Sequence, residues 1–397
     1  MKKIANSKRS DAGESGRVRD SDPHQDSEPS SNQLRVVIAG GGTGGHVYPA
    51  LALADALLDR GVSGERIRLI GARRGIEARL FPETSFTFTW LSLSGLDRSK
   101  TPISVWRNVV AVASLILGVF RVAWMLLLNR PDCVVGVGGY ASAPCVVAAR
   151  ILGIPVVVHE QNASPGLVNR LAVRLGARAA ISLPGTPLKG CVLTGNPVRR
   201  AISEITRTPN QLRPLVGIVG GSLGAGRLND AALGLASRWG VRTDVSLRHV
   251  TGPRFLESCE SAYKSQRLPI DVLDYQIVGY EEQIETLYSG AALLVCRAGA
   301  LTVAEICAAG VPSILIPWPG AAGDHQSRNA EALVSAGGAI LLLDADCDEA
   351  KLDSLLAPLL ADSERLARMS AAALTLSLPN AARDLAILVE EVSNAST

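Results

Sequence analysis

A cluster of polar side chains within 291–329 has the residue types and the spacing that would bind a nucleotide. An apolar run at 291–295 is typical of a buried strand, Gly299 interrupts it, and the spacing at 301–309 predicts a helix. A second apolar run at 313–316 completes a strand–helix–strand unit, so two turns face one crevice. Helix N-terminal amides attract a diphosphate, and a carboxylate one turn into the helix can accept hydrogen bonds from ribose hydroxyls. The polar residues of the two turns are Arg297, Thr302, Glu305, His325, Gln326 and Asn329.

Thr302 and Glu305 have a second interpretation. Thr-x-x-Glu also matches a capping box, in which the two side chains satisfy the first backbone amides of a helix. A pair with that role needs no ligand. This segment alone leaves both interpretations open.

A glycine-rich loop at 40–45 offers another anion-binding element, and a histidine follows it. The apolar run before the loop predicts a strand, and the Ala- and Leu-rich run at 50–58 predicts a helix. The loop matches the G-x-G-x-x-G dinucleotide fingerprint, and Arg73-Arg74 after the next strand could hold the 2′-phosphate of NADP. His46 could act as a base near neutral pH. The alternative is a solvent-exposed histidine in the first turn of the helix.

Three further loops follow predicted strands at 138–144, 159–162 and 194–199. In open parallel sheets, ligands bind beyond the carboxyl ends of the strands, and these loops lie at such ends. Each polar residue could instead make only a turn or cap hydrogen bond. The residues of interest are Gly138, Gly139, Tyr140, His159, Glu160, Gln161, Asn162, Asn196 and Arg199.

The opening pattern of strand, glycine loop and helix occurs twice. Its second copy starts at 215–219 and continues into Gly220-Gly-Ser222-Leu-Gly224, with further strands expected at 247–251 and 270–273. We therefore predict an α/β protein of two Rossmann-like doubly wound domains that face each other across a cleft. The expected division is a disordered polar tail at 1–33, a first domain at 34–199, a linker at 200–213, a second domain at 214–376, and a C-terminal helix at 377–397 that packs back on the first domain.

The composition excludes several classes of protein. Hydrophobic residues make up 47% of the 397 residues and aromatic residues only 4%, which favours parallel α/β sheets over a β-sandwich. The net charge of +3 and the lack of a basic stripe argue against a nucleic-acid partner.

The seven cysteines have no paired spacing, which indicates buried thiols in a reducing compartment. We expect no metal, because Asp344-Ala-Asp346 lies in an acidic patch and no other cluster has ligand spacing.

The segment 109–128 is 20 residues long, contains a single charge, Arg121, and just reaches the length of a membrane span. A charge near the middle of a span would cost about 2.5 to 3.5 kcal/mol. We expect one or two helices here, part core and part membrane-facing, whose basic residues meet anionic head groups and whose tryptophans lie at the interface. The alternative is a helix that packs on the sheet with no membrane role. The flanking basic and aromatic residues are Arg98, Lys100, Trp106, Arg107 and Trp124.

Seven separate motifs, in order, give the chain from about residue 34 to its end a specific resemblance. It resembles the bacterial N-acetylglucosaminyltransferases of peptidoglycan synthesis in glycosyltransferase family 28. The motifs are Gly-Gly-Thr-Gly-Gly-His46, Gly-Gly-Tyr140, His159-Glu-Gln-Asn162, Gly-Asn-Pro-Val-Arg199, Gly-Gly-Ser222, Gly299-Ala-Leu-Thr-Val-Ala-Glu305 and His325-Gln-x-x-Asn329.

The resemblance implies a GT-B fold and one reaction. N-acetylglucosamine (GlcNAc) would pass from UDP-GlcNAc to the 4-hydroxyl of N-acetylmuramic acid (MurNAc) on undecaprenyl-pyrophosphoryl-MurNAc-pentapeptide (lipid I). The product would be lipid II, formed with inversion and without a cofactor or an essential metal. Such an enzyme would sit peripherally on the cytoplasmic face of the cell membrane, with other cell-wall synthesis or division proteins as further partners.

The family also implies roles for residues of this chain. His46 is our choice of base for the acceptor hydroxyl, and Glu160 is its rival. Glu305 would bind the ribose, Ser222 and Arg199 the diphosphate, and His325 and Gln326 the sugar. The full set predicted for UDP-GlcNAc is Thr43, Gly44, Gly45, Asn162, Arg199, Ser222, Glu281, Leu301, Thr302, Glu305, His325, Gln326 and Asn329. The set predicted for the acceptor pyrophosphate is Gly42, Thr43, Gly138, Gly139 and Tyr140.

Three motifs depart from the family pattern. Ala143 replaces a glycine of the tyrosine loop, Leu223 replaces a glutamine after Ser222, and Tyr280-Glu-Glu-Gln-Ile284 replaces the usual uracil-binding turn. A glycolipid or antibiotic glycosyltransferase would share the donor residues but not the paired acceptor loops. An NADP-dependent oxidoreductase would leave Glu305 and the second glycine loop unexplained. A non-catalytic binding subunit would not need both halves of the cleft.

Overall fold

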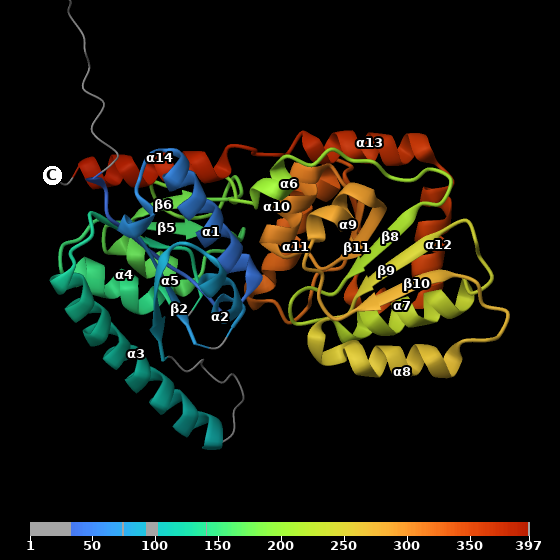
Figure 1. Ribbon diagram of the computed structural model, residues 1–397, viewed down its shortest axis with the longest axis horizontal. Coiled ribbons are helices and arrows are strands. Elements are labelled where there is room, and N and C mark those ends of the chain that lie inside the picture. The colour runs from blue at the N-terminus through green and yellow to red at the C-terminus, as the bar shows by residue number, and fades with distance from the viewer. Residues whose placement is uncertain (1–32, 74, 93–101, 140, 396–397) are drawn as a thin grey trace, which may run out of the picture.

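Two α/β lobes lie side by side in the protein (Figure 1). The computed structural model describes residues 33–73, 75–92, 102–139 and 141–395, and only the backbone of 102–105, 107 and 108. Several predictions fall outside this part of the chain: the tail at 1–32, Arg74, Arg98, Lys100, the side chain of Arg107, and Tyr140.

Within the described residues, the first lobe is a seven-stranded parallel sheet in the order β3-β2-β1-β4-β5-β6-β7. This order reverses direction next to β1, which places the loop after β1 at the switch point where open sheets bind ligands. The strands are β1 Val36–Ala39, β2 Ile67–Ala72, β3 Thr87–Leu91, β4 Cys133–Gly136, β5 Val156–Glu160, β6 Arg178–Ile181 and β7 Val192–Leu193. The helices are α1 Gly44–Asp59, η2 Gly64–Arg66, α2 Glu77–Leu80, η3 Phe81–Glu83, α3 Pro102–Leu128, α4 Ser142–Ile151 and α5 Leu167–Arg174.

The second lobe repeats the plan with a six-stranded parallel sheet in the order β10-β9-β8-β11-β12-β13. Its strands are β8 Leu215–Val219, β9 Ser246–Val250, β10 Asp274–Val278, β11 Ala291–Cys296, β12 Ser313–Leu315 and β13 Ala339–Leu341. A short helix, α6 Arg200–Ser203, precedes this lobe. The helices of the lobe are α7 Gly226–Arg238, η4 Pro253–Phe255, α8 Leu256–Gln266, α9 Ile284–Gly290, α10 Ala300–Ala309, η5 Ala322–Asp324, α11 His325–Ser335, η6 Asp344–Asp346, α12 Glu349–Leu360 and α13 Ser363–Leu374. The strand expected at 270–273 is wrong: those residues precede β10, and Ile270 and Val272 are exposed.

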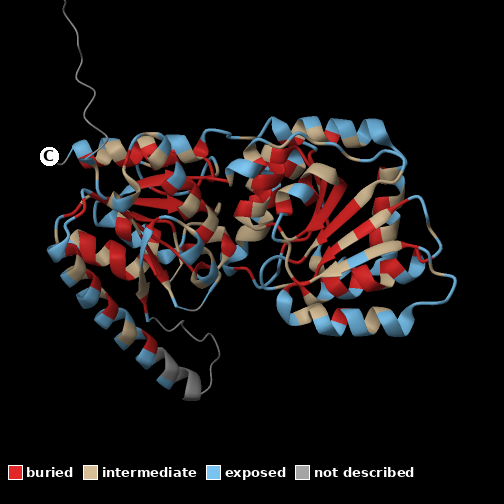
Figure 2. Ribbon diagram, in the orientation of Figure 1, coloured by how far each residue is buried: buried red, intermediate tan, exposed pale blue. Residues whose placement is uncertain are grey.

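Each sheet is packed on both faces, as parallel strands require. Figure 2 shows the central strands of both lobes as buried, with exposed positions concentrated on the outer helices. Apolar runs such as β4 and β11 are buried at every position because helices cover both of their sides. Residues that leave these strands at their carboxyl ends therefore emerge from rigid supports.

The last helix, α14 Ala381–Asn394, belongs to the first lobe although the chain reaches it from the second (Figure 1). It packs against α1 and places Leu385 and Val389 in one core cluster with Ile38. Arg60 forms an ion pair with Glu390 at 2.6 Å. The chain therefore crosses between the lobes twice.

Helix α3 is a single helix of 27 residues that extends along the outside of the first lobe (Figure 1). Val122 and Leu126 are buried against the sheet and α4. Leu117, Phe120 and Trp124 are 66–69% exposed on the opposite side. In the described residues, Val109–Leu128 is the one helical stretch long and apolar enough to cross a membrane, and 22% of it is buried.

Candidate active site

A cavity of about 1,600 Å³ lies between the lobes and collects most of the predicted site residues. The carboxyl ends of strands from both sheets face it, which is why loops distant in sequence meet there. The predicted residues that line it are Thr43, Gly44, Gly45, His46, Gly138, Gly139, Glu160, Asn162, Arg199, Ser222, Glu281, Leu301, Thr302, Glu305, His325 and Gln326. Gly42 and Asn329 are not among its lining residues, and Tyr140 is outside the described part of the chain.

His46 stands in the first turn of α1, directly after the glycine loop. It is partly buried, and its Nδ1 lies 3.3 Å from the hydroxyl of Thr43. Burial lowers the pKa of His46 to about 4, and a hydrogen bond to the Gly41 carbonyl opposes that shift. The imidazole is therefore neutral at pH 7 and has one nitrogen able to accept a proton. The alternative of a fully solvent-exposed histidine is wrong.

The two glycine loops of the first lobe touch each other beside His46. A Cβ atom on Gly139 would lie 2.2 Å from the Gly41 carbonyl oxygen, and one on Gly138 would lie 2.6 Å from Cδ2 of His46. Gly138 and Gly139 also have positive φ angles, +97° and +78° respectively. Only glycine allows this approach and this backbone conformation together.

Glu160, the rival base, is engaged in holding its own loop. It is 3% exposed, and its two oxygens accept hydrogen bonds from the amides of Asn162 at 3.0 Å and Gly166 at 2.9 Å. The side-chain amides of Asn169 and Asn162 donate a third and a fourth bond, at 2.8 Å and 3.3 Å. A carboxylate with these partners would have to give up a bond to take a proton, so the geometry favours His46 as the base.

On the second lobe, Glu305 is 4% exposed and lies one turn into α10. Its carboxylate accepts from Arg199 at 3.1 Å and from the hydroxyl of Tyr288 at 3.1 Å. Burial raises the pKa of Glu305, while the charge of Arg199 acts in the opposite direction. The capping-box interpretation of Thr302 and Glu305 is wrong, because α10 begins at Ala300 and has no side-chain cap.

Aromatic residues complete the same region. The guanidinium of Arg199 lies 4.1 Å from the ring centre of Tyr48, which comes from the first lobe. The hydroxyl of Tyr48 shares a hydrogen bond of 2.7 Å with that of Tyr280 on the second lobe. The charged and aromatic groups of the two lobes are thus in direct contact at this end of the cavity.

Asn162 and Asn329 form a second contact between the lobes. The Asn329 side chain donates to Asn162 at 3.2 Å and accepts from the amide of Ala163 at 3.0 Å. It also donates to the Ala298 carbonyl at 3.3 Å and is fully buried. Asn329 is therefore placed to hold the lobes together behind the cavity wall.

The remaining predicted residues lie on the second-lobe side of the cavity, and several of them already have protein partners. Gln326 accepts from the amide of Trp318 at 2.8 Å, and His325 pairs with the Ala322 carbonyl at 2.9 Å. Glu281 forms an ion pair with Arg248 at 2.9 Å, so its side chain already has a partner. Ser222 is exposed after Gly221, which has a φ angle of +81°.

Of the two aspartates at 344 and 346, Asp344 is paired with cations. Asp344 forms ion pairs with Arg297 at 2.6 Å and with Arg227 at 3.4 Å. Among the residues that the structure describes, no group of three or more His, Cys, Asp or Glu side chains could hold a metal ion.

Four residues that contribute to the site were missed by sequence reasoning: Glu77, Tyr48, Tyr288 and Asn169. Tyr48 meets a partner 232 residues away, and the partners of the other three lie 5 to 35 residues away, in other elements. The one local signal was the aromatic position two residues after His46.

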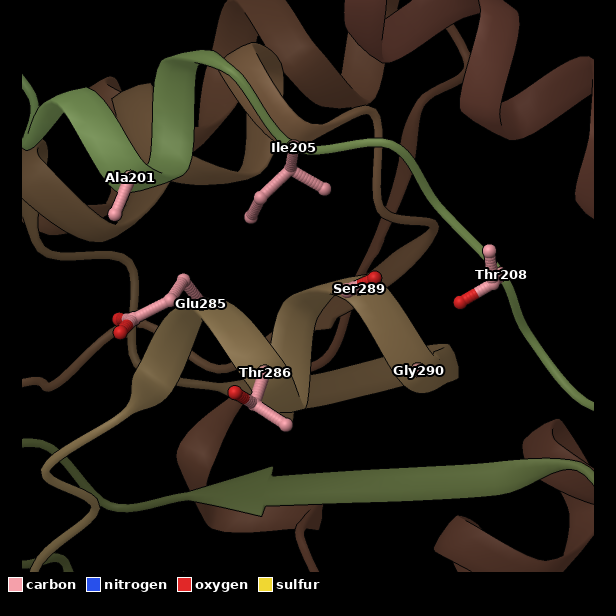
Figure 3. Close-up of a pocket in the computed structure, with 7 residues that line it drawn as sticks. All are labelled: Ala201, Ile205, Thr208, Glu285, Thr286, Ser289 and Gly290. Atoms are coloured by element: carbon pink, nitrogen blue, oxygen red, sulfur yellow. The ribbon is translucent and has the colours of Figure 1, made fainter.

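A smaller cavity of about 370 Å³ lies apart from the site, between α6, the linker and α9 (Figure 3). Its lining is mostly hydroxyl and small apolar side chains, with one carboxylate, Glu285. This surface lacks the convergent polar groups of the main cavity.

Comparison with known proteins extends over both lobes. Residues 36–181 match the sequence model of the glycosyltransferase family 28 N-terminal domain, and residues 215–385 match that of its C-terminal domain. The chain belongs to glycosyltransferase family 28. The alternative of an NADP-dependent oxidoreductase is therefore wrong, and the GT-B fold is confirmed.

Relatives in this family are similar over their full length. A protein of Methylococcus capsulatus is 39% identical over 90% of this chain and 98% of its own. It is named UDP-N-acetylglucosamine--N-acetylmuramyl-(pentapeptide) pyrophosphoryl-undecaprenol N-acetylglucosamine transferase. A Frankia casuarinae protein of the same name is 38% identical over 90% of this chain and 96% of its own.

Solved structures agree with this assignment. The crystal structure of Acinetobacter baumannii MurG is 30% identical, covers 90% of this chain and 99% of its own, and superposes with a TM-score of 0.68. A glycosyltransferase of kitacinnamycin, at 16% identity and a TM-score of 0.65, shares the fold alone.

Proposed function

We propose that the protein transfers GlcNAc from UDP-GlcNAc to the 4-hydroxyl of MurNAc in lipid I and so forms lipid II. The observation that carries this proposal is a single cavity that joins two glycine loops and His46 on the first lobe to Glu305 on the second, with Arg199 in contact with groups from both. The names of full-length relatives in the family support the same pair of substrates.

The donor lies against the second lobe in this proposal. Glu305, one turn into α10, accepts hydrogen bonds from the ribose hydroxyls, since a carboxylate has more acceptor sites than its two protein partners fill. Arg199 and Ser222 contact the diphosphate, where a cation and backbone amides stabilise the charge that develops on leaving UDP. His325 and Gln326 line the wall where the sugar would lie.

The acceptor pyrophosphate lies against the glycine loops of the first lobe. Thr43, Gly138 and Gly139 line the cavity, and the first amides of α1 and α4 offer positive dipole ends to an anion. Gly42 differs from our expectation, because its amide donates to Glu77 rather than into the cavity. We therefore assign Gly42 a structural part in the loop.

His46 acts as the base. The acceptor 4-hydroxyl oxygen forms a bond to the anomeric carbon, the bond from that carbon to the diphosphate breaks, and the hydroxyl proton passes to the neutral imidazole. Attack from the face opposite to the leaving group inverts the configuration. UDP leaves with the bonding electron pair, beside Arg199.

The acceptor's polyprenol would reach the bilayer along α3. Ala111 and Leu115 of α3 line the same cavity as His46, and the exposed apolar side of the helix continues from them. We propose peripheral binding to the cytoplasmic face of the membrane through this side, with basic residues near it meeting anionic head groups. Other cell-wall synthesis or division proteins are further expected partners.

The purified protein tests this proposal with a soluble, short-chain analogue of lipid I. We expect glycosyl transfer from UDP-GlcNAc, release of UDP, and stabilisation against heat by UDP-GlcNAc but not by NADPH. UDP-glucose should be a poor donor. Failure to glycosylate the muramyl analogue, with UDP-GlcNAc bound, would rule out the proposed acceptor.

A further inference from the structure

Glu77 is a fully buried carboxylate that lies behind the glycine loop, outside the residues that line the cavity. Both of its oxygens accept from the Gly42 amide at 2.9 Å, and one also accepts from the Ala72 amide at 3.1 Å. A buried carboxylate is costly unless its hydrogen bonds are strong. The side chain thus ties the loop after β1 to the end of β2.

The backbone around Glu77 is shaped to admit it. A Cβ atom on Gly41 would lie 2.3 Å from one carboxylate oxygen, and a Cβ on Gly75 would lie 2.3 Å from the other. A Cβ on Gly71 would lie 2.9 Å from its Cγ. Glycines from three segments leave the space that this one side chain fills.

The peptide unit between Gly41 and Gly42 connects Glu77 to His46. Its N–H donates to Glu77, and in a trans peptide its carbonyl points the opposite way. That carbonyl lies beside the His46 ring and opposes the fall of its pKa. A Cβ on Gly139 would lie 2.2 Å from the carbonyl oxygen, and one on the adjacent Gly138 would lie 2.6 Å from Cδ2 of the ring. A charged acceptor on the N–H polarises the peptide and strengthens its carbonyl as an acceptor.

We propose that Glu77 is a positioning residue for the transfer reaction: through the Gly41–Gly42 peptide it fixes the orientation and the tautomer of His46. The ring nitrogen that faces Gly41 keeps its proton, and the other nitrogen carries the lone pair that can accept one. In a catalytic triad, a carboxylate orients the histidine by a direct hydrogen bond. Here one peptide unit stands between the carboxylate and the histidine. It rests on the proposed role of His46 as the base.

Glu77→Gln tests the relay, because it keeps the size of the side chain and removes its charge. The matched control is Glu83→Gln, an exposed carboxylate in the following turn, η3. Both variants would be assayed with UDP-GlcNAc and a short-chain lipid I analogue, melted thermally, and labelled with ¹⁵N-histidine for NMR. His46→Ala assigns the His46 signals.

We expect kcat of Glu77→Gln to fall about 10- to 100-fold, the range seen for partners that orient metal-binding histidines, with KM for UDP-GlcNAc changed less than twofold. The His46 nitrogen signals should change from one tautomer to a mixture. Glu83→Gln should match the wild type in both measurements. If Glu77→Gln does not fold, Gly41→Ala disturbs the same contact from the other side and should alter the same signals.

Two outcomes would overturn the relay: unchanged His46 signals in a folded variant, or a loss of kcat matched by an equal loss of UDP-GlcNAc binding and melting temperature. Failure of the proposed base is a separate result. In that case, His46→Ala would keep the wild-type kcat while the His46 signals still responded to Glu77→Gln.

Discussion

At the scale of single residues, burial sets the protonation state of His46. An imidazole held neutral at pH 7 is a ready base, and Thr43 and Gly41 limit how its ring can turn. The sequence predicted this histidine because it follows a glycine loop. It could not predict the ring's partners, since these depend on the loop's backbone.

His46→Ala should lower kcat by about 10²- to 10⁴-fold, the usual contribution of general base catalysis. Binding of UDP should change little, because Glu305 and Ser222, which are proposed to hold the ribose and the diphosphate, lie on the second lobe. Steady-state kinetics and calorimetric titration with UDP measure the two effects separately. Equal activity with and without the imidazole would remove His46 from the mechanism.

Two buried histidines and the partly buried His46 should make stability depend on pH. Burial lowers the pKa of His46, His159 and His249 from 6.5 to about 4. Between pH 6.5 and 4 the unfolded chain therefore binds more protons than the folded one, and the free energy of unfolding falls as pH falls. Each histidine contributes up to about 3 kcal/mol to that fall.

A variant of His249 measures the contribution of one histidine to this pH dependence. His249 lies on β9, away from the cavity, and forms hydrogen bonds with Tyr275 and Asn229. In urea unfolding at pH 7 and pH 4.5, His249→Gln should lose about 2 kcal/mol less than the wild type on acidification. Parallel losses in the two proteins would contradict the prediction.

At the scale of elements, the buried strands were the easiest to predict. Runs such as 291–295 are apolar at every position because helices cover both faces of the sheet. Strand β10 was misplaced for the opposite reason: it is an edge strand with polar residues, while apolar Ile270 and Val272 before it are exposed. Helix α2 was missed because four residues carry too little periodicity.

Helix α3 is a long apolar run, but one side of it is buried and the other is exposed. The sequence predicted an apolar, helical stretch at 109–128, whereas the single helix extends over 102–128. Only packing distinguishes Val122 and Leu126, inside, from Leu117, Phe120 and Trp124, outside. Exposed apolar side chains gathered on one side of a helix are a mark of an interaction surface.

Phe120→Glu should reduce binding to vesicles that contain anionic lipid by about tenfold or more, because burying a Phe side chain contributes about 1.5 to 3 kcal/mol. Its melting temperature should stay close to that of the wild type. The control is Leu212→Glu, an exposed apolar residue in the linker, which should bind as the wild type does. Co-sedimentation measures both, and equal binding of the two variants would exclude this side of α3.

At the scale of the whole molecule, the repeated opening of strand, glycine loop and helix predicted two lobes and a cleft. The contacts that join the lobes could not be predicted. Tyr48 with Tyr280, and Asn162 with Asn329, pair residues more than 160 positions apart. Their meeting depends on how two separately folded sheets are oriented.

The hydroxyl pair of Tyr48 and Tyr280 can be tested by a double-mutant cycle. Each Tyr→Phe change removes the same hydrogen bond, which contributes about 0.5 to 1.5 kcal/mol. Each single variant should melt about 2 °C lower, and the double variant should melt no lower than the worse single one. Additive losses would show that the two hydroxyls act independently.

Helix α14 has a consequence for the order in which the protein is made. A ribosome synthesises the strands of the first lobe long before 381–394, yet those late residues fill part of that lobe's interior. The nascent first lobe therefore waits, with an open apolar groove beside α1, while the whole second lobe emerges. The half of the enzyme that is translated first is the last to be completed, and a chain cut short before α14 leaves it unfinished.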